Sequence, residues 1–196
     1  MTERRTKVIR ETAETNIKVE LNIDGSGQFE ITTGLRMFDH LLSQLAQHGV
    51  FDIKISASGP DQHHVVEDVA IALGKAFNQA LRGKQGIVRM AHAIVPMDEA
   101  LAAVAVDIGG RVYSIIEADF DEASIGDLDA DLIRHFLVSL ASEAKINLHA
   151  KVLSGINDHH KAEALFKALG RALDSATLID ERILGRVPST KEVIEG

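Results

Sequence analysis

The chain has 196 residues, of which 45% are hydrophobic and 26% charged, and this composition fits one ordinary globular domain or two small ones. The net charge is -8 with no stripe of Lys and Arg, so nucleic acid is not expected as a partner, and the absence of cysteine excludes disulfides and thiolate metal ligands. The charged N-terminus has no apolar signal-peptide core and no run approaches a membrane span, so we expect a soluble, cytoplasmic protein with no membrane contact.

Hydrophobic periodicity predicts two similar series of strands and helices along the chain. For the first series we expect strands at residues 7–10, 17–22, 28–32 and 51–57, with helices at 35–47 and 64–81. For the second we expect strands at 89–95, 101–107, 112–118 and 147–153, with helices at 128–142 and 160–176. Each series is therefore a β-β-β-α-β-α unit.

A repeat in the sequence supports this duplication. His63-His64-x-x-Glu67 recurs 96 residues later as His159-His160-x-x-Glu163, and each motif is followed by Ala-Leu-Gly, a basic residue and Ala. We interpret the chain as an α+β fold with two mixed sheets, each bearing a pair of helices. The expected division is a first half at 1–85, a second half at 86–180 and a C-terminal tail at 181–196.

The repeated motif has the spacing of a metal site. Residues i and i+4 share one face of a helix, so His63 and Glu67 can offer a nitrogen and an oxygen to one ion. His159 and Glu163 can do the same. Imidazole with carboxylate suits a first-row divalent metal such as Mn, Fe, Co, Ni or Zn. A single motif is weak, but two copies predict metal binding.

The remaining histidines of the repeat extend the site. His64 and His160 point about 100° away from their neighbours, so they serve something else. His40 and His135 occupy equivalent positions on the preceding predicted helices. Six His and two Glu would supply two equivalent sites of three nitrogens and one oxygen. If the second His of each motif joins the ion of the other repeat, the divergence of the paired rings is explained.

Other polar residues have weaker signals. His48 either lines a substrate site or is an ordinary helix-end residue. His92 and His149 lie in predicted strands, where a structural role is favoured. Asp98 and Glu99 fit an ordinary polar turn between strands.

Three basic residues are candidates for binding an anion. Arg89, Arg111 and Lys191 are separately typical of surface charges, but together they would form a phosphate pocket, since Arg pairs well with phosphate oxygens. Sequence alone does not bring them together, and it assigns Glu14 to solvent.

Taken together, these motifs resemble imidazoleglycerol-phosphate dehydratase over nearly the whole chain. The resemblance is carried by Glu14–Ile17, Asp24–Gly27, Phe38–His40, Asp61–His64 with Glu67–Asp68, Pro96–Ala100, Asn157–His160 with Glu163, and Pro188–Lys191. The chain departs from the family pattern at Arg36 and Glu192, where the family usually has Gly, and at Gly109 and Val112, where it usually has Ser and Pro. These departures concern loop shape near Arg111 and Lys191.

The resemblance implies a ribosomal protein S5 domain 2-like fold and two Mn²⁺ ions per active site. It assigns one ion to His40, His64, His159 and Glu163, and the other to His63, Glu67, His135 and His160. It implies phosphate binding by Arg89, Arg111, Ser189, Thr190 and Lys191. It places Glu14, His40, His48, Glu67 and Glu163 among the catalytic residues, of which Glu14, His40 and His48 also contact the substrate. A homo-oligomer of 24 subunits with sites at its interfaces is implied, with Glu14 from a neighbouring subunit.

The implied reaction is dehydration of D-erythro-imidazoleglycerol phosphate to imidazole-acetol phosphate in histidine biosynthesis. Metals at the two ring nitrogens would favour the imidazolate, which expels the adjacent hydroxyl to give a diazafulvene-like intermediate, while Glu14 transfers protons. Two other functions remain open at this point: a dinuclear hydrolase of phosphate esters, and a non-catalytic metal-storage or assembly protein.

Overall fold

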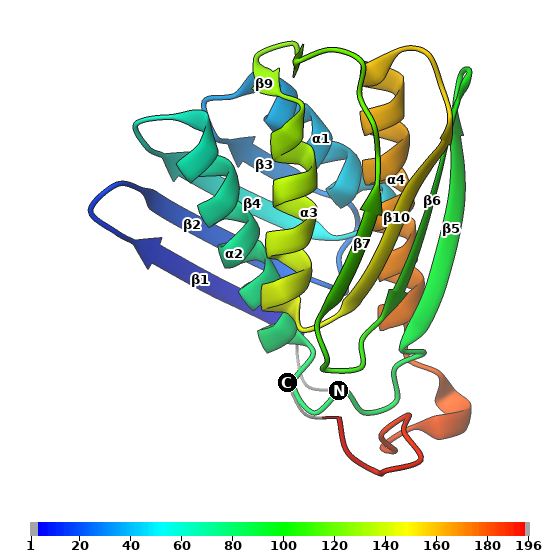
Figure 1. The fold of residues 1–196 in the computed structure, drawn as a ribbon. Coiled ribbons are helices and arrows are strands. Elements are labelled where there is room, and N and C mark those ends of the chain that lie inside the picture. The colour runs from blue at the N-terminus through cyan, green and yellow to red at the C-terminus, as the bar shows by residue number, and fades with distance from the viewer. Residues whose placement is uncertain (1–3, 195–196) are drawn as a thin grey trace.

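The computed structural model describes residues 4–194, and within them two four-stranded mixed sheets enclose four helices (Figure 1). The first sheet has the order β1-β2-β4-β3 and the second the order β5-β6-β10-β7. The edge strands β3 and β7 are parallel to their neighbours β4 and β10, and the other pairs are antiparallel. The two sheets therefore share one topology, and the α+β duplication expected from the sequence is confirmed. The division of the chain at residues 85 and 180 stays a prediction.

The strands alternate buried and exposed residues, as expected for sheets with one face on a core. The bounds in the first sheet are β1 (Arg5–Glu11), β2 (Asn16–Asn22), β3 (Phe29–Thr32) and β4 (Asp52–Ser58). The bounds in the second are β5 (Met90–Met97), β6 (Ala100–Asp107), β7 (Tyr113–Glu117) and β10 (Asn147–Ser154). A short 3-10 turn (Glu181–Ile183) follows the last helix and begins the tail.

Four helices fill the space between the sheets (Figure 1). They are α1 (Arg36–His48), α2 (Gln62–Ala80), α3 (Asp131–Ala144) and α4 (Asp158–Thr177). Helix α2 packs on β1 and β2, α4 packs on β5 and β6, and the halves meet where α2 contacts α3 and α1 contacts α4. Phe136 of α3 joins the halves, since its ring lies 5.4 Å from that of Phe38 and 5.3 Å from that of Phe166.

The glycine repeated in the sequence has a structural cause. A Cβ on Gly74 of α2 would lie 2.6 Å from the carbonyl oxygen of Leu140 in α3. A Cβ on Gly170 of α4 would lie 2.7 Å from the carbonyl oxygen of Leu45 in α1. Only glycine permits these close helix crossings. The repeated Ala-Leu-Gly sequence therefore reflects the same helix packing in both halves.

The predicted start of α3 is wrong, and the other predicted bounds differ from the observed ones by at most two residues. Helix α3 begins at Asp131 rather than 128, because β9 (Leu128–Asp129) pairs with β8 (Ser124–Ile125) in a small hairpin. Gly126 makes that turn at φ 62°, a conformation that favours glycine. Among residues 4–194, none of the helices is long and apolar enough to cross a membrane.

Candidate metal and substrate sites

The two histidine motifs lie in the first turns of α2 and α4. The side chain of Asp61 accepts a hydrogen bond from the backbone N–H of His64 and caps α2. The side chain of Asn157 accepts from the N–H groups of His159 and His160 and caps α4. Asp and Asn are favoured N-cap residues because they satisfy N–H groups that lack helical partners. The caps thus fix where each motif begins.

The first group of candidate ligands, called here the His40 cluster, comprises His40 of α1 with His159 and Glu163 of α4. Their potential ligand atoms all lie within 4.8 Å of one another. Nε2 of His40 is 2.9 Å from Oε2 of Glu163, and Nε2 of His159 is 3.2 Å from the same oxygen. Two ring nitrogens and a carboxylate thus converge from both halves of the chain.

Glu163 is held as a carboxylate. Its burial acts to raise the pKa, but hydrogen bonds from Lys167 and His40 outweigh burial and lower the pKa to about 2. The ammonium of Lys167 lies 2.7 Å from Oε1, which leaves Oε2 for the histidines. The carboxylate is therefore charged at neutral pH and presents one oxygen to the cluster.

The second group, called here the His63 cluster, comprises His63 and Glu67 of α2 with His135 of α3, again within 4.8 Å of one another. The rings of His63 and His135 stack with centroids 4.8 Å apart. Nε2 of His135 is buried, has no hydrogen-bond partner among the described residues, and lies 3.5 Å from Oε1 of Glu67. A buried imidazole nitrogen without a partner, beside a carboxylate and a second imidazole, fits a divalent cation.

A loop of the second half positions α1 and its His40. The backbone N–H groups of Arg36 and Met37 donate to the carboxylate of Asp127, which lies between β8 and β9. Leu35, the residue before the helix, provides no side-chain cap. These amide hydrogen bonds also lower the pKa of Asp127, and the one from Met37 has the larger effect.

His64 and His160 do not join either cluster within residues 4–194. Nδ1 of His64 is 2.6 Å from Asp61, and Nε2 of the same ring is 3.2 Å from Glu14. Nδ1 of His160 is 2.8 Å from Glu99. These Nδ1 hydrogen bonds raise the pKa of both histidines. The predicted fourth nitrogen of each ion site is thus not supplied by the same chain in this structure.

Glu14 lies in a turn that is fastened to α2. The hydroxyl of Thr12 accepts from the N–H groups of Glu14 and Thr15. The hydroxyl of Thr15 donates to the buried Asp68, which also binds Arg10 at 2.7 Å. Glu14 is exposed, as the sequence indicated, and these contacts hold it beside His64.

The predicted phosphate residues come together around the tail. A pocket of about 790 Å³ is lined by Arg89, Met90, Gly109, Arg111, Ile183, Arg186–Lys191, Val193 and Ile194. The guanidinium of Arg89 donates to both oxygens of Asp107 and to the carbonyl of Pro188, so it fastens the tail to β6. Glu192 has φ 58°, the left-handed conformation that favours the family's glycine.

The other histidines lie outside both clusters. Burial lowers the pKa of His48, and the nearby charges of Lys167 and Arg171 lower it further. His48 therefore lies at the end of α1 near Lys167 and Arg171 of α4. This position is compatible with a residue that lines the substrate site and with an ordinary helix-end residue. His92 and His149 are exposed on the outer face of the second sheet, each opposite Ala105.

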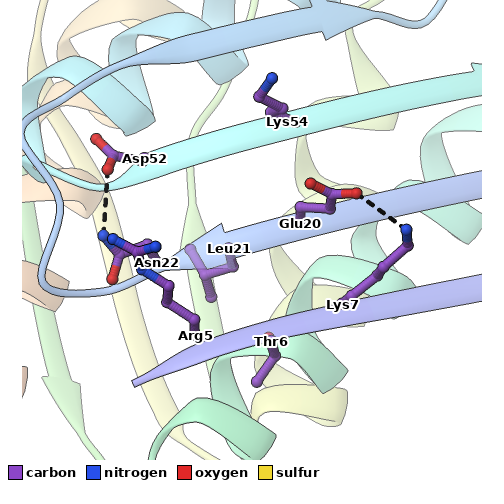
Figure 2. A pocket seen from close by; sticks show the side chains of 8 residues that line it. All are labelled: Arg5, Thr6, Lys7, Glu20, Leu21, Asn22, Asp52 and Lys54. Carbon is purple, nitrogen blue, oxygen red and sulfur yellow. Dashed lines mark hydrogen bonds and ion pairs between the residues drawn. The ribbon is translucent and has the colours of Figure 1, made fainter. Parts of the chain in front are cut away.

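The outer face of the first sheet holds a separate pocket of about 510 Å³ (Figure 2). Lys7 pairs with Glu20 at 3.2 Å, and Asn22 donates to Asp52 at 3.1 Å. The residues that line it are Arg5, Thr6, Lys7, Glu20, Leu21, Asn22, Asp52 and Lys54, and no candidate site residue is among them.

Several residues that contact the candidate metal ligands were not predicted from the sequence. Lys167 follows Glu163 by four residues, a spacing that puts both on one helix face and was available as a signal. Asp61 was visible as an N-cap but not as a partner of an imidazole. Glu99 is in a polar turn as expected, yet it reaches His160 from 61 residues away, and no local pattern predicts that contact.

The fold and these clusters define a duplicated α+β protein with two candidate metal sites at the interface between its halves. Comparison with known proteins identifies the family. The family model for imidazoleglycerol-phosphate dehydratase matches residues 33–173. The imidazoleglycerol-phosphate dehydratase of Dehalococcoides mccartyi strain 195 is 57% identical over 195 residues, covering 100% of both chains.

Solved structures agree with this assignment. The crystal structure of the dehydratase from Pyrococcus furiosus matches with a TM-score of 0.83 at 38% identity, covering 94% of this chain and 99% of that one. That of the dehydratase from Staphylococcus aureus matches with a TM-score of 0.81 at 30% identity, covering 89% and 100%. The chain belongs to the imidazoleglycerol-phosphate dehydratase family. It is a hydro-lyase of histidine biosynthesis, which decides against the phosphate-ester hydrolase and the storage protein.

Proposed function

We propose that the chain dehydrates imidazoleglycerol phosphate with two divalent cations, manganese by resemblance, held by the His40 and His63 clusters. The observation that carries this proposal is the repeated geometry: each cluster joins the first His and the Glu of one motif to a histidine from the other half. The partnerless Nε2 of His135 is a further sign of a missing ligand. Two equivalent sites suit a substrate ring with two nitrogens.

The fourth ligand of each ion would come from another copy of the chain. We assign His64 to the ion of the His40 cluster and His160 to the ion of the His63 cluster. In this structure both rings lie outside the clusters, and each has its Nδ1 occupied by a carboxylate. Neighbouring subunits would supply them, as expected for sites at the interfaces of a homo-oligomer of 24 subunits.

The length of α4 also supports a site shared between subunits. The backbone N–H of Arg89 donates to the carbonyl of Ala176, 13 residues after Glu163. At about 1.5 Å rise per residue, the two contacts lie roughly 20 Å apart along the helix. One imidazole ring with a three-carbon phosphate chain is shorter than that. The phosphate pocket of one subunit would therefore serve the clusters of another, with the phosphate held by Arg89, Arg111, Ser189, Thr190 and Lys191.

The residues of the chain then divide the work of the reaction. Bound cations would stabilise the deprotonated form of the substrate ring, which helps to expel the neighbouring hydroxyl. Glu163, charged and fastened by Lys167, keeps its position while the substrate enters. Glu14, held by its turn beside Nε2 of His64, is placed to move a proton to or from the substrate chain. We expect this chemistry to take place in the cytoplasm.

The test is dehydration of imidazoleglycerol phosphate by protein stripped of metal with a chelator and then reloaded with Mn²⁺. We expect activity to be lost on stripping and restored on reloading, with two ions bound per chain. Undiminished turnover by metal-free protein would contradict the proposal. The assignment of ligands is tested by His64→Ala and His160→Ala, which should each weaken a different ion site.

A further inference from the structure

We propose that Asp61 and Glu99 are positioning residues that fix the proton of His64 and His160 on Nδ1, so that the lone pair of each ring lies on Nε2, the nitrogen that would bind an ion. This inference rests on the proposed two-ion function. Its basis is geometric: a carboxylate oxygen lies 2.6 Å from Nδ1 of His64 and 2.8 Å from Nδ1 of His160.

The hydrogen bond at Nδ1 decides which nitrogen can bind a metal. A neutral imidazole carries one proton, and a carboxylate can only accept, so the proton stays on the nitrogen that faces it. The other nitrogen, Nε2, then presents a lone pair. Partners of this kind orient metal-binding histidines and raise their basicity.

Backbone donors prevent either carboxylate from turning. One oxygen of Asp61 accepts from the N–H of His64 at 3.0 Å, and only the second faces the ring. One oxygen of Glu99 accepts from the N–H groups of Ile156 and Asn157 at 3.1 and 2.8 Å, and again the second faces the ring. Each ring therefore meets a fixed acceptor.

The two halves supply this acceptor from different places. Asp61 and Asn157 are equivalent N-caps, 96 residues apart. The amide nitrogen of Asn157 cannot accept a proton, so the cap of α4 cannot serve His160 as Asp61 serves His64. Glu99, from the turn between β5 and β6, occupies that role. The matching turn between β1 and β2 carries Glu14, which lies 3.2 Å from Nε2 of His64, while Asp98, beside Glu99, lies 3.7 Å from Nε2 of His160.

Matched amide substitutions test the proposal. In Glu99→Gln and Asp61→Asn the amide oxygen must stay on the backbone N–H donors, which turns the NH2 group toward Nδ1. The ring proton then moves to Nε2 and blocks that nitrogen. We expect Asp61→Asn to weaken Mn²⁺ binding by about 10- to 100-fold at the His40 cluster, and Glu99→Gln to weaken it by the same factor at the His63 cluster. Each variant should leave the other ion site unchanged. Glu30→Gln, which removes an exposed partner of Lys54 on the outer face of the first sheet, is the control.

The readout is site-specific metal occupancy rather than activity. Anomalous scattering from crystals of the assembled protein at limiting Mn²⁺ gives the occupancy of each ion, and a titration followed by electron paramagnetic resonance gives the affinity. Two fully occupied ions in both variants would overturn this inference. Failure of the unaltered protein to bind two ions would instead overturn the proposed function.

A second variant uses the internal repeat. Adding Asn157→Asp to Glu99→Gln restores a carboxylate at the position equivalent to Asp61, so we expect part of the lost affinity to return. If the double variant binds Mn²⁺ no more tightly than Glu99→Gln, the two halves do not share this device, and the equivalence of Asp61 and Glu99 is wrong.

Discussion

At the residue scale, Glu14 is the side chain that we propose for proton transfer. It is exposed, has no role in the core, and is held 3.2 Å from Nε2 of His64 by the turn around Thr12 and Thr15. Glu14→Gln keeps size and removes the proton acceptor, so we expect turnover to fall by about 10²- to 10⁴-fold. Metal content and oligomer size should not change. Steady-state assays, metal analysis and light scattering check this, and unchanged turnover would remove Glu14 from the mechanism.

Lys84 is a buried amine that the proposed function does not use. Within residues 4–194 its Nζ has no hydrogen-bond partner, and burial lowers its pKa. A buried donor without a partner costs about 1–3 kcal/mol. Lys84→Met should therefore raise the free energy of unfolding by roughly that amount at neutral pH.

The pH dependence provides the check on Lys84. Between its lowered pKa and the ordinary lysine pKa of 10.5, the unfolded chain binds more protons than the folded chain, so stability rises with pH in that window. In Lys84→Met this contribution should disappear, which denaturant titrations at pH 8 and pH 10 would reveal. A variant that is less stable than the unaltered protein at both pH values would contradict the assignment.

At the scale of elements, the sequence predicts what is local and misses what is distant. The helices that carry both motifs were predictable because apolar periodicity and caps lie within a few residues of each other. The start of α3 was missed because Leu128 is apolar and fits a helix, but it pairs with Ile125 in the small hairpin. The contacts of Asp127 with α1 and of Glu99 with His160 span tens of residues, and only the fold brings them together.

The cap on α1 gives a prediction at this scale. Asp127→Ala leaves the N–H groups of Arg36 and Met37 without their acceptor, and we expect a loss of about 1 kcal/mol in the free energy of unfolding. Because α1 carries His40, we also expect weaker Mn²⁺ binding at the His40 cluster alone. Asp131→Ala, at the start of α3, is the comparison. Equal occupancy of both ions in Asp127→Ala would show that the cap does not position His40.

At the scale of the whole molecule, the duplication explains why the candidate ligands of each cluster come from both halves. Each close glycine crossing brings a helix of one half against a helix of the other, α2 with α3 and α1 with α4. Those are the pairs that carry the two clusters. The sequence repeat indicated two equivalent ligand sets, whereas the three-dimensional packing shows which helices form each one. Which subunit would supply each candidate ligand could not be predicted, because the sequence pattern of one chain does not describe its contacts with other copies.

The separation of Glu14 from the phosphate pocket gives the last prediction. Glu14 lies beside His64 at the start of α2. The loop with Arg111 lies at the end of α3, where the N–H of Gly110 donates to the carbonyl of Lys145. The start of α2 and the end of α3 are far apart in the fold (Figure 1). If one site takes these residues from different subunits, Glu14→Gln and Arg111→Ala should each be nearly inactive alone. The two variants are then dissociated and reassembled together in equal amounts. About half of the sites would receive a native Glu14 and about half a native Arg111, so about a quarter would contain both. Recovery of about a quarter of the native activity, with no recovery when the preformed oligomers are simply mixed, is the expected result. Absence of recovery after verified subunit exchange would mean that one chain supplies both residues to its site.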